Sequence, residues 1–303
     1  MADLSRYGWR PVDPPRRPVL FVNPRSGGGR AARAQLAERA RERRIDVVVL
    51  GPGDDLEALA DDAAAGGADA LGIAGGDGSL AVVAAAAMEH GLPFVCVPAG
   101  TRNHFALDLG VDRRDLIGAL DAFTDGVERP VDTAEVNGRV FVNNVSLGVY
   151  GDAVRQPGYR DAKVRTLIKT AAAVLGPSAA VPPVLTLVDD VGRDHPRPAL
   201  VLVSNNPYAL DRPLVFATRP RLDLGELGIV VLDPPAAGAD PPVRSWTDTH
   251  LEIGAATSVP AGIDGEAAEL QPPLRVSIRP GALRVRISVR HPGVSPSGGL
   301  ASG

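Results

Sequence analysis

Short, almost wholly apolar runs alternate with longer stretches of helical composition in the first part of the chain. Hydrophobic residues fill nearly every position of the runs at residues 18–23, 45–50, 70–74 and 93–97. Strands that are apolar on both faces are typical of a parallel sheet covered by helices on both sides. The pattern therefore predicts an α/β fold, with helices at residues 30–44, 54–65, 80–90, 105–109 and 113–123.

The pattern changes near Pro130. Beyond it, apolar and polar positions often alternate, which predicts strands and an antiparallel β-sandwich. The expected strands lie at residues 139–145, 184–188, 199–204, 229–232, 250–255, 274–278 and 283–289, with one helix at residues 161–175. We therefore expect an α/β domain at residues 18–130 and a β-sandwich domain at residues 131–290, between a flexible N-terminus (1–17) and a disordered tail (291–303).

Composition supports two domains and makes a nucleic-acid partner unexpected. The 303 residues are too many for a comfortable single core. The formal net charge is −4 and no basic tract occurs, so no nucleic-acid partner is expected.

The one cysteine, Cys96, lies in an apolar run and is expected to be a buried strand residue. Residues 1–17 do not resemble a secretory signal, and prolines interrupt the apolar stretch at residues 166–188. We expect a cytoplasmic protein that meets any lipid from the membrane surface.

A glycine-rich loop, Gly75-Gly76-Asp77-Gly78-Ser79, follows the third apolar run directly. Glycines let backbone N–H groups approach phosphate oxygens, and the following helix N-terminus adds a favourable partial positive charge. An aspartate cannot attract phosphate, so its expected task is to hold a Mg²⁺ ion that bridges nucleotide phosphates. A plain tight turn stays an alternative for this loop alone. It is not a Walker A loop, because Gly-Lys-[Ser/Thr] is absent.

Two further loops follow apolar runs in the same way. The loop at residues 23–29 offers a nucleotide polar groups and glycine amides from Asn23, Pro24, Ser26 and Gly27, and Arg25 or Arg30 would add charge. The loop at residues 98–103 offers Thr101 and Asn103. His104 follows it, and a histidine there is more often a cap or a surface group than a ligand. Because the carboxyl ends of parallel strands lie at one edge of a sheet, we expect the three loops to meet.

The segment Gly262-Ile263-Asp264-Gly265-Glu266 places two carboxylates around a glycine in the second domain. A kinase that acts on an alcohol needs a base or positioning group for the hydroxyl, and aspartate is a usual choice. Asp-Gly is also a strong hairpin signal. Taken alone, the segment favours a turn over a catalytic site.

In this order, the four motifs resemble the diacylglycerol kinase catalytic family, which includes bacterial soluble lipid kinases, sphingosine kinases and ceramide kinase. The resemblance covers about residues 18–290 and includes the segments at residues 131–137 and 141–148. It implies an N-terminal α/β domain related to NAD kinase and phosphofructokinase, a β-sandwich C-terminal domain, and ATP in the cleft between them. Each motif is modest, but the ordered set is specific.

The resemblance also implies a role for each matched residue. Asp77 would act on the nucleotide phosphates and Mg²⁺, and Thr101 and Asn103 would line the nucleotide site. Asp264 would be the general base toward a lipid hydroxyl, with Glu266 in support.

Departures from the family pattern concern the metal. Ser79 stands where the family often has threonine, and it keeps the hydroxyl. His104 stands where many soluble bacterial members have aspartate, which removes one candidate metal carboxylate, although Asp132 falls where the family has a carboxylate near the metal. Asp223 lies one place off the Asp-Gly turn that holds a structural Mg²⁺ in some members, so that ion is not expected here.

The sequence thus predicts an ATP- and Mg²⁺-dependent lipid kinase for a diacylglycerol-like or sphingoid hydroxyl. Residues 18–130 would bind the nucleotide and residues 131–290 the lipid. Two alternatives stay open: a kinase of NAD or another soluble metabolite, which the Gly-Gly-Asp-Gly loop fits equally well, and a nucleotide-binding regulator without catalysis, which His104 suggests. Sheet edges in the β-rich domain offer a route to a homodimer.

Overall fold

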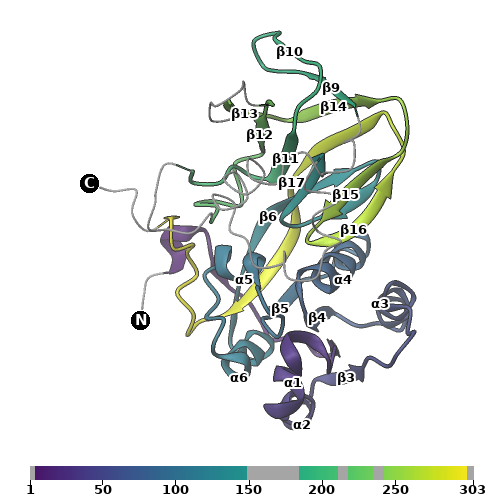
Figure 1. The fold of residues 1–303 in the computed structure, drawn as a ribbon. Coiled ribbons are helices and arrows are strands. Elements are labelled where there is room, and N and C mark those ends of the chain that lie inside the picture. The colour runs from purple at the N-terminus through teal and green to yellow at the C-terminus, as the bar shows by residue number, and fades with distance from the viewer. Residues whose placement is uncertain (1–3, 149–183, 211–217, 235–241, 299–303) are drawn as a thin grey trace. The chain divides into compact units, whose positions relative to one another are not determined.

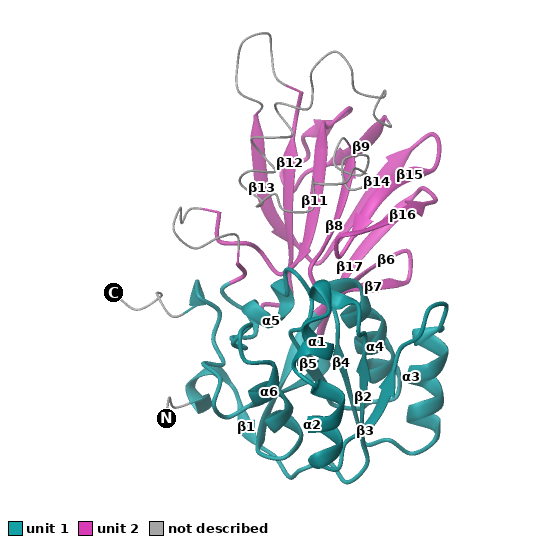
Figure 2. Cartoon of the chain, turned by 60° about the horizontal axis from the view of Figure 1, so that its bottom comes forward, with its two compact units in different colours: residues 1–132, 220–223, 281–303 teal, residues 133–219, 224–280 magenta. Residues whose placement is uncertain are grey.

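The computed structural model describes residues 4–148, 184–210, 218–234 and 242–298. The chain divides into two compact units (Figure 2). Unit 1 comprises residues 1–132, 220–223 and 281–303, and unit 2 comprises residues 133–219 and 224–280. The helix expected at residues 161–175 lies outside the described residues.

Unit 1 is built on a parallel sheet. Its order is β5-β4-β2-β3, formed by β5 (Phe94–Val97), β4 (Ala70–Ala74), β2 (Pro18–Val22) and β3 (Asp46–Val49). All positions of β2, β4 and β5 are buried, which confirms that strands apolar on both faces mark a sheet covered on both sides.

Helices follow the strands in alternation (Figure 1). The apolar cluster on one face of the sheet includes residues of α1 (Arg30–Arg33), α2 (Leu36–Glu42) and α6 (Leu116–Ala119). Unit 1 also contains α3 (Leu56–Ala65), α4 (Asp77–Glu89), α5 (His104–Asp108), and the 3-10 helices η1 (Leu4–Tyr7), η2 (Ser26–Gly28) and η3 (Leu120–Phe123). The helix expected at residues 30–44 is two helices, because Gln35 adopts a left-handed φ of 49° that no stop signal announces.

Unit 2 is an antiparallel β-sandwich. One sheet has the order β13-β12-β11-β8-β15-β16. Its strands are β13 (Val243–Asp248), β12 (Leu227–Leu232), β11 (Leu200–Asn205), β8 (Asn144–Gly148), β15 (Val259–Ile263) and β16 (Glu266–Leu270). The opposing strands include β9 (Leu185–Val188), β10 (Asp194–His195) and β14 (His250–Ala255). Buried residues of both layers form one apolar cluster, so the expected sandwich is confirmed.

Two long strands belong partly to each unit. They are β6 (Gly126–Val136), which pairs with β1 (Arg10–Pro11) and β7 (Arg139–Phe141), and β17 (Leu274–Ser288). The sequence suggested separate strands at residues 274–278 and 283–289, both in the second domain. Instead β17 is continuous: its first part pairs with β14 in unit 2, and residues 281–288 lie in unit 1, where Val285 pairs with Phe94 of β5.

The two segments expected to lack structure are packed in unit 1. Trp9 is 1% exposed, and its Nε1 donates a hydrogen bond of 2.6 Å to the carbonyl oxygen of Gly293. The N–H of Gly293 donates in turn to Gly110, and Ser295 and Ser297 are buried. Composition did not reveal this order because each segment is held by residues far away in the sequence. No helix in the described ranges is long and apolar enough to cross a membrane.

Candidate functional site

The three glycine-rich loops of unit 1 lie against one another where β2, β4 and β5 end. A Cβ on Gly27, whose φ is 57°, would lie 2.2 Å from the carbonyl oxygen of Ala99. A Cβ on Gly100 would lie 2.6 Å from the Cα of Gly76. Neither position accepts a side chain unless a neighbouring loop moves. The expected meeting of the three loops at one sheet edge is confirmed.

Arg30 fastens two of these loops together. Its Nη1 donates to the carbonyl oxygens of Pro98 and Gly100 at 3.2 and 3.3 Å, and its Nη2 donates to that of Arg113 at 2.7 Å. The sequence offered Arg30 as a charge for phosphate, but the structure uses its guanidinium to bind loop carbonyls. Arg25, the other candidate, is exposed.

Asp77 stands in the first turn of α4, directly after Gly76 at the helix N-cap. Its Oδ2 accepts a hydrogen bond of 3.2 Å from the backbone N–H of His104, so this histidine links two loops through its main chain. Its Oδ1 is buried and has no hydrogen-bond partner among the described residues. A buried acceptor without a partner is unfavourable, and a cation or its bound water would satisfy it.

The negative charge of Asp77 also affects Cys96 in β5. Burial raises the pKa of the Cys96 thiol well above its ordinary value, and the negative charge of Asp77 raises it further. Cys96 is 3% exposed, which confirms that it is a buried strand residue. A thiol in this environment stays protonated and unreactive.

The remaining loop residues have different surroundings. Asn23 accepts a hydrogen bond from the N–H of Arg25 at its Oδ1 (3.1 Å), and Ser26 begins η2. Asn103 is 3% exposed, and its Nδ2 donates to the Gly100 carbonyl oxygen at 2.7 Å. Its Oδ1 is buried and lacks a partner in the described part of the chain. The Thr101 side chain is exposed.

Asp132 is held by the backbone of β17. It is 2% exposed, and its Oδ1 accepts a hydrogen bond of 2.8 Å from the N–H of Gly281. No cluster of three or more histidine, cysteine, aspartate or glutamate side chains with the spacing of a metal site occurs in the residues that the structure describes. A Mg²⁺ ion near Asp77 would therefore take much of its coordination from phosphate oxygens and water, as Mg²⁺ commonly does.

In unit 2, Asp264 and Gly265 form the turn between β15 and β16. Their φ angles are 48° and 86°, so both central residues are left-handed, as in a type I′ hairpin. Asp264 Oδ2 accepts from the N–H of Val142 at 2.9 Å, and its Oδ1 accepts from those of Asn143 and Asn144 at 2.8 and 3.0 Å. The turn that the sequence indicated is present, and its aspartate binds a segment distant in the chain.

The same segment is held from its other side by Arg219, which sequence analysis missed. Arg219 is fully buried, and its Nη1 donates to the carbonyl oxygens of Val142 and Asn205 at 2.7 and 2.8 Å. Its Nη2 donates to Asn143 Oδ1 at 2.8 Å. A carboxylate thus binds the N–H groups of residues 142–144 while a guanidinium binds carbonyl oxygens. No motif around Arg219 announces this role.

The Glu266 side chain, two residues after Asp264, differs in its surroundings. It is exposed at the start of β16, whereas Asp264 is 8% exposed. Neither a hydrogen bond nor an ion pair joins the Glu266 side chain to another described residue. Of the two predicted catalytic carboxylates, one is therefore anchored in the fold and the other faces solvent.

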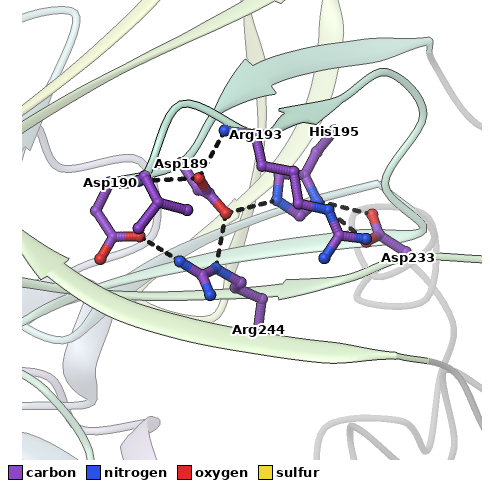
Figure 3. Close-up of polar contacts among 7 residues, drawn as sticks. Asp189, Asp190, Arg193, His195, Asp233 and Arg244 are labelled. Carbon is purple, nitrogen blue, oxygen red and sulfur yellow. Dashed lines mark hydrogen bonds and ion pairs between the residues drawn. The ribbon is translucent and has the colours of Figure 1, made fainter.

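A second charged cluster of unit 2 contains no predicted site residue (Figure 3). His195 lies between two carboxylates: its Nδ1 is 3.0 Å from Asp233 Oδ1, and its Nε2 is 3.3 Å from Asp189 Oδ2. Arg244 Nε approaches the same Asp189 oxygen at 2.7 Å. The His195 ring stacks on Trp246 with 6.3 Å between centroids. The cluster joins β9, β10 and β13, which indicates a structural role.

Asp189 is strongly acidic in this cluster. Burial alone would raise its pKa, but hydrogen bonds from the N–H groups of Arg193 and Val191, the contact with His195 and the charge of Arg244 outweigh it and lower the pKa from 3.8 to about 2. The carboxylate therefore stays ionised through the neutral and mildly acidic range.

Sequence relatives place this arrangement among known proteins. Residues 17–136 match the family described as the diacylglycerol kinase catalytic domain. "Probable lipid kinase YegS-like" from Pseudomonas aeruginosa is 29% identical over 304 residues, covering 90% of this chain and 95% of the relative. The "Diacylglycerol kinase" of Bacillus subtilis is 39% identical over 77 residues, which cover 25% of each chain.

Solved structures share the fold. A protein from Bacillus anthracis described as a diacylglycerol kinase matches with a TM-score of 0.62 at 17% identity, covering 91% of this chain and 98% of its own. Another chain from that organism matches with a TM-score of 0.68 at 19% identity, covering 92% and 100%. The fold is thus the expected α/β domain followed by a β-sandwich, as in these solved structures. Residues 17–136 are similar to the diacylglycerol kinase catalytic domain.

Proposed function

We propose that this protein is a kinase that transfers the γ-phosphoryl group of ATP to the hydroxyl of a diacylglycerol-like or sphingoid lipid. The observation that carries the proposal is the buried, unpartnered Oδ1 of Asp77, placed where three glycine-rich loops meet. The names of the relatives support a lipid acceptor. A cytoplasmic enzyme that works at the membrane surface fits this chemistry.

The loops are proposed to hold the nucleotide. Backbone N–H groups of Gly75, Gly76 and Gly78 would approach phosphate oxygens, and the N-terminus of α4 favours negative charge there. The loop at residues 23–29 and the polar groups of Thr101, Asn103 and Ser79 would complete the nucleotide site.

Asp77 fits a Mg²⁺ ion because its Oδ1 lacks a protein partner and its Oδ2 is fixed by the His104 N–H. Asp132 is proposed as a further carboxylate near the metal. When bound, Mg²⁺ neutralises phosphate charge that develops during transfer. The contribution of the chain is to fix the position of Asp77 before the nucleotide arrives.

Asp264 and Glu266 are proposed to serve the acceptor. The three backbone N–H donors around Asp264 fix the position of its carboxylate. A fixed carboxylate suits phosphoryl transfer, because the loose transition state requires mainly a well-placed acceptor for the hydroxyl proton. The exposed Glu266 would support Asp264 in positioning the hydroxyl.

A transfer assay with radiolabelled ATP tests the proposal. Wild-type protein is incubated with Mg²⁺ and a panel of diacylglycerol, sphingosine, ceramide and NAD, and the products are separated by thin-layer chromatography. Label on a lipid is expected, and Asp77→Asn should abolish it while the surface variant Asp46→Asn should not. If only NAD is labelled, the acceptor is a soluble metabolite and not a lipid. If ATP binds but no product is labelled, the protein is a nucleotide-binding regulator.

A further inference from the structure

Unit 1 contains a positively charged cavity of about 730 Å³, lined in part by the loop at residues 98–103. Five arginines line it: Arg30, Arg102, Arg113, Arg114 and Arg290. Two aspartates, Asp112 and Asp115, also line it, so the charge of its wall is positive by three when its histidine is neutral. Such an excess of arginine favours an anionic ligand.

Most of the charged groups in this wall already have protein partners. Arg30 binds loop carbonyls, Arg113 Nη1 donates to the Arg102 carbonyl oxygen at 3.0 Å, and Arg290 Nη1 lies 3.2 Å from Asp121 Oδ2. Asp115 Oδ1 accepts from the Gly118 N–H. Those contacts fix the positions of these side chains, and Asp121 offsets the charge of Arg290, so the wall stays positively charged.

Two donors in the wall are different. Arg102 Nη2 and His291 Nε2 are buried, and neither has a hydrogen-bond partner within the described ranges. His291 is 4% exposed, and its Nδ1 accepts a hydrogen bond of 3.3 Å from the N–H of Asp112. Burial lowers the pKa of His291, although nearby carboxylates oppose this, so the neutral ring carries its proton on Nε2. Both atoms are therefore N–H donors without acceptors, which is unfavourable unless a ligand supplies one.

The cavity lies apart from two of the three proposed phosphate-binding loops. Among the described residues, none from the glycine-rich loops at residues 23–29 and 75–79 lines it. Its wall is formed by α5, the turn at residues 110–115 and the segment at residues 290–296, together with Thr101, Arg102 and Asn103 of the third loop. The apolar side chains of Leu107, Val111 and Val294 face the same space, which exceeds the volume of a phosphate ion.

We propose that this cavity binds the phosphate group of a phosphomonoester. Arg102 Nη2 and His291 Nε2 donate to its oxygens, the other arginines supply charge, and the organic part of the ester packs on the apolar wall. The unpartnered Asn103 Oδ1 accepts from a hydroxyl of the ester. The site stands on the geometry of unit 1 alone and does not depend on the proposed kinase activity.

Calorimetric titration of the full chain with inorganic phosphate tests the site. The titration is made with a non-hydrolysable ATP analogue present, so that the glycine-rich loops are filled. Wild-type protein should bind phosphate, and Arg102→Gln should weaken binding about tenfold or more, because a charge-assisted hydrogen bond is lost. Arg41→Gln removes an exposed arginine of α2 and should leave the affinity unchanged.

His291→Asn provides an independent variant. Asparagine can retain an acceptor for the Asp112 N–H but has no donor at the Nε2 position, so phosphate binding should weaken while thermal unfolding stays near that of wild type. Arg102→Lys should restore part of the affinity. Equal phosphate affinity in wild type, Arg102→Gln and His291→Asn would overturn the proposal, as would loss of all phosphate binding in the presence of the ATP analogue.

Two further probes distinguish the source of the phosphate group. Glycerol 3-phosphate represents a soluble ester, and phosphatidylcholine vesicles with or without phosphatidic acid represent a lipid headgroup. Sedimentation of wild type but not Arg102→Gln with the phosphatidic acid vesicles assigns the site to a headgroup. Competition by glycerol 3-phosphate without vesicle binding assigns it to a soluble ester. Binding of neither probe overturns the inference.

Discussion

Two Asp-Gly pairs, one in each unit, differ in whether the protein supplies hydrogen-bond donors to both carboxylate oxygens of the aspartate. Asp77 and Gly78 open a helix, and one carboxylate oxygen of Asp77 is buried without a partner. Asp264 and Gly265 close a hairpin, and both oxygens of Asp264 accept backbone hydrogen bonds. The carboxylate of Asp77 thus has an oxygen available to a ligand, whereas the carboxylate of Asp264 is used in hydrogen bonds within the fold.

This difference decides how the two residues should be tested. Substitution of Asp77 is expected to remove the proposed interaction with a metal ion and to spare the fold. Substitution of Asp264 removes the acceptor for the N–H groups of residues 142–144, so a loss of activity there is not by itself proof of a catalytic role. Stability and transfer must be measured on the same variants.

The largest effect is expected for Asp264→Ala. Three backbone N–H groups, two buried and one part-buried, would lose their acceptor. Each unsatisfied buried group costs about 1–3 kcal/mol before relaxation, so the free energy of unfolding should fall by about 3–5 kcal/mol. Urea denaturation measures this. The exposed Glu266→Ala serves as the control and should change stability by less than about 0.5 kcal/mol. A similarly small change for Asp264→Ala would remove the distinction between the two aspartates.

Asp77→Asn should show the reverse behaviour. The rate of phosphoryl transfer should fall by about 100-fold or more, because the proposed metal loses its protein carboxylate. The free energy of unfolding should stay within about 1 kcal/mol of wild type, since Asn can still accept the His104 N–H. Initial rates at saturating lipid, together with urea curves, give both quantities. Unfolding as severe as in Asp264→Ala would make Asp77 a structural residue as well.

A matched pair of glycines tests how the loops hold Asp77. Gly27 and Gly28 both have left-handed φ angles, but a Cβ on Gly28 meets nothing within 4 Å, whereas one on Gly27 would meet Ala99. Gly28→Ala should cost about 1 kcal/mol of stability through backbone strain alone. Gly27→Ala should cost more and weaken ATP binding about tenfold, since about 1.4 kcal/mol of loop displacement gives that factor. Calorimetry with ATP compares them, and equal affinities would show that the loop contact does not shape the nucleotide site.

The smallest expected effect is on the stability of the protein at acid pH, through Asp189. The pKa of Asp189 is lowered from 3.8 to about 2 in the folded chain, so its stabilising contribution is complete above about 4 and is lost as the pH falls toward 2. Unfolding midpoints of wild type should therefore decline over this range. Asp189→Asn should be less stable at neutral pH and show a shallower decline. Parallel curves for the two proteins would mean that the Asp189 contacts with Arg244 and His195 do not govern acid stability.

Local signals account for most of what could be predicted. The parallel strands β2, β4 and β5 are readable because burial on both faces leaves no polar positions. The loop at residues 75–79 is readable because its chemistry lies within five consecutive residues. The hairpin at Asp264 announces its turn but not its function. Its partner Val142 lies 122 positions away, and only the folded chain brings them together.

Most features that could not be predicted also depend on contacts between residues far apart in the sequence. Trp9 is ordered by Gly293, and Arg219 by carbonyl groups of Val142 and Asn205. Gln35 ends a helix in a run whose composition is helical throughout. The cavity donors Arg102 and His291 come from segments that seemed a loop and a tail when considered separately.

Strand β17 has a consequence for the order in which the chain can fold during synthesis. Residues 274–280 supply the neighbour of β14, and residues 281–288 supply the neighbour of β5. β17 is the last strand to be synthesised, so neither β5 nor β14 can pair with it until the other strands have been made. Phe94 of β5 therefore has no partner on this side until Val285 is present. The contact between β5 and β17 joins residues far apart in the sequence, and such contacts form slowly. A nascent chain therefore carries β5 with an unpaired edge, where chaperones or aggregation would act first.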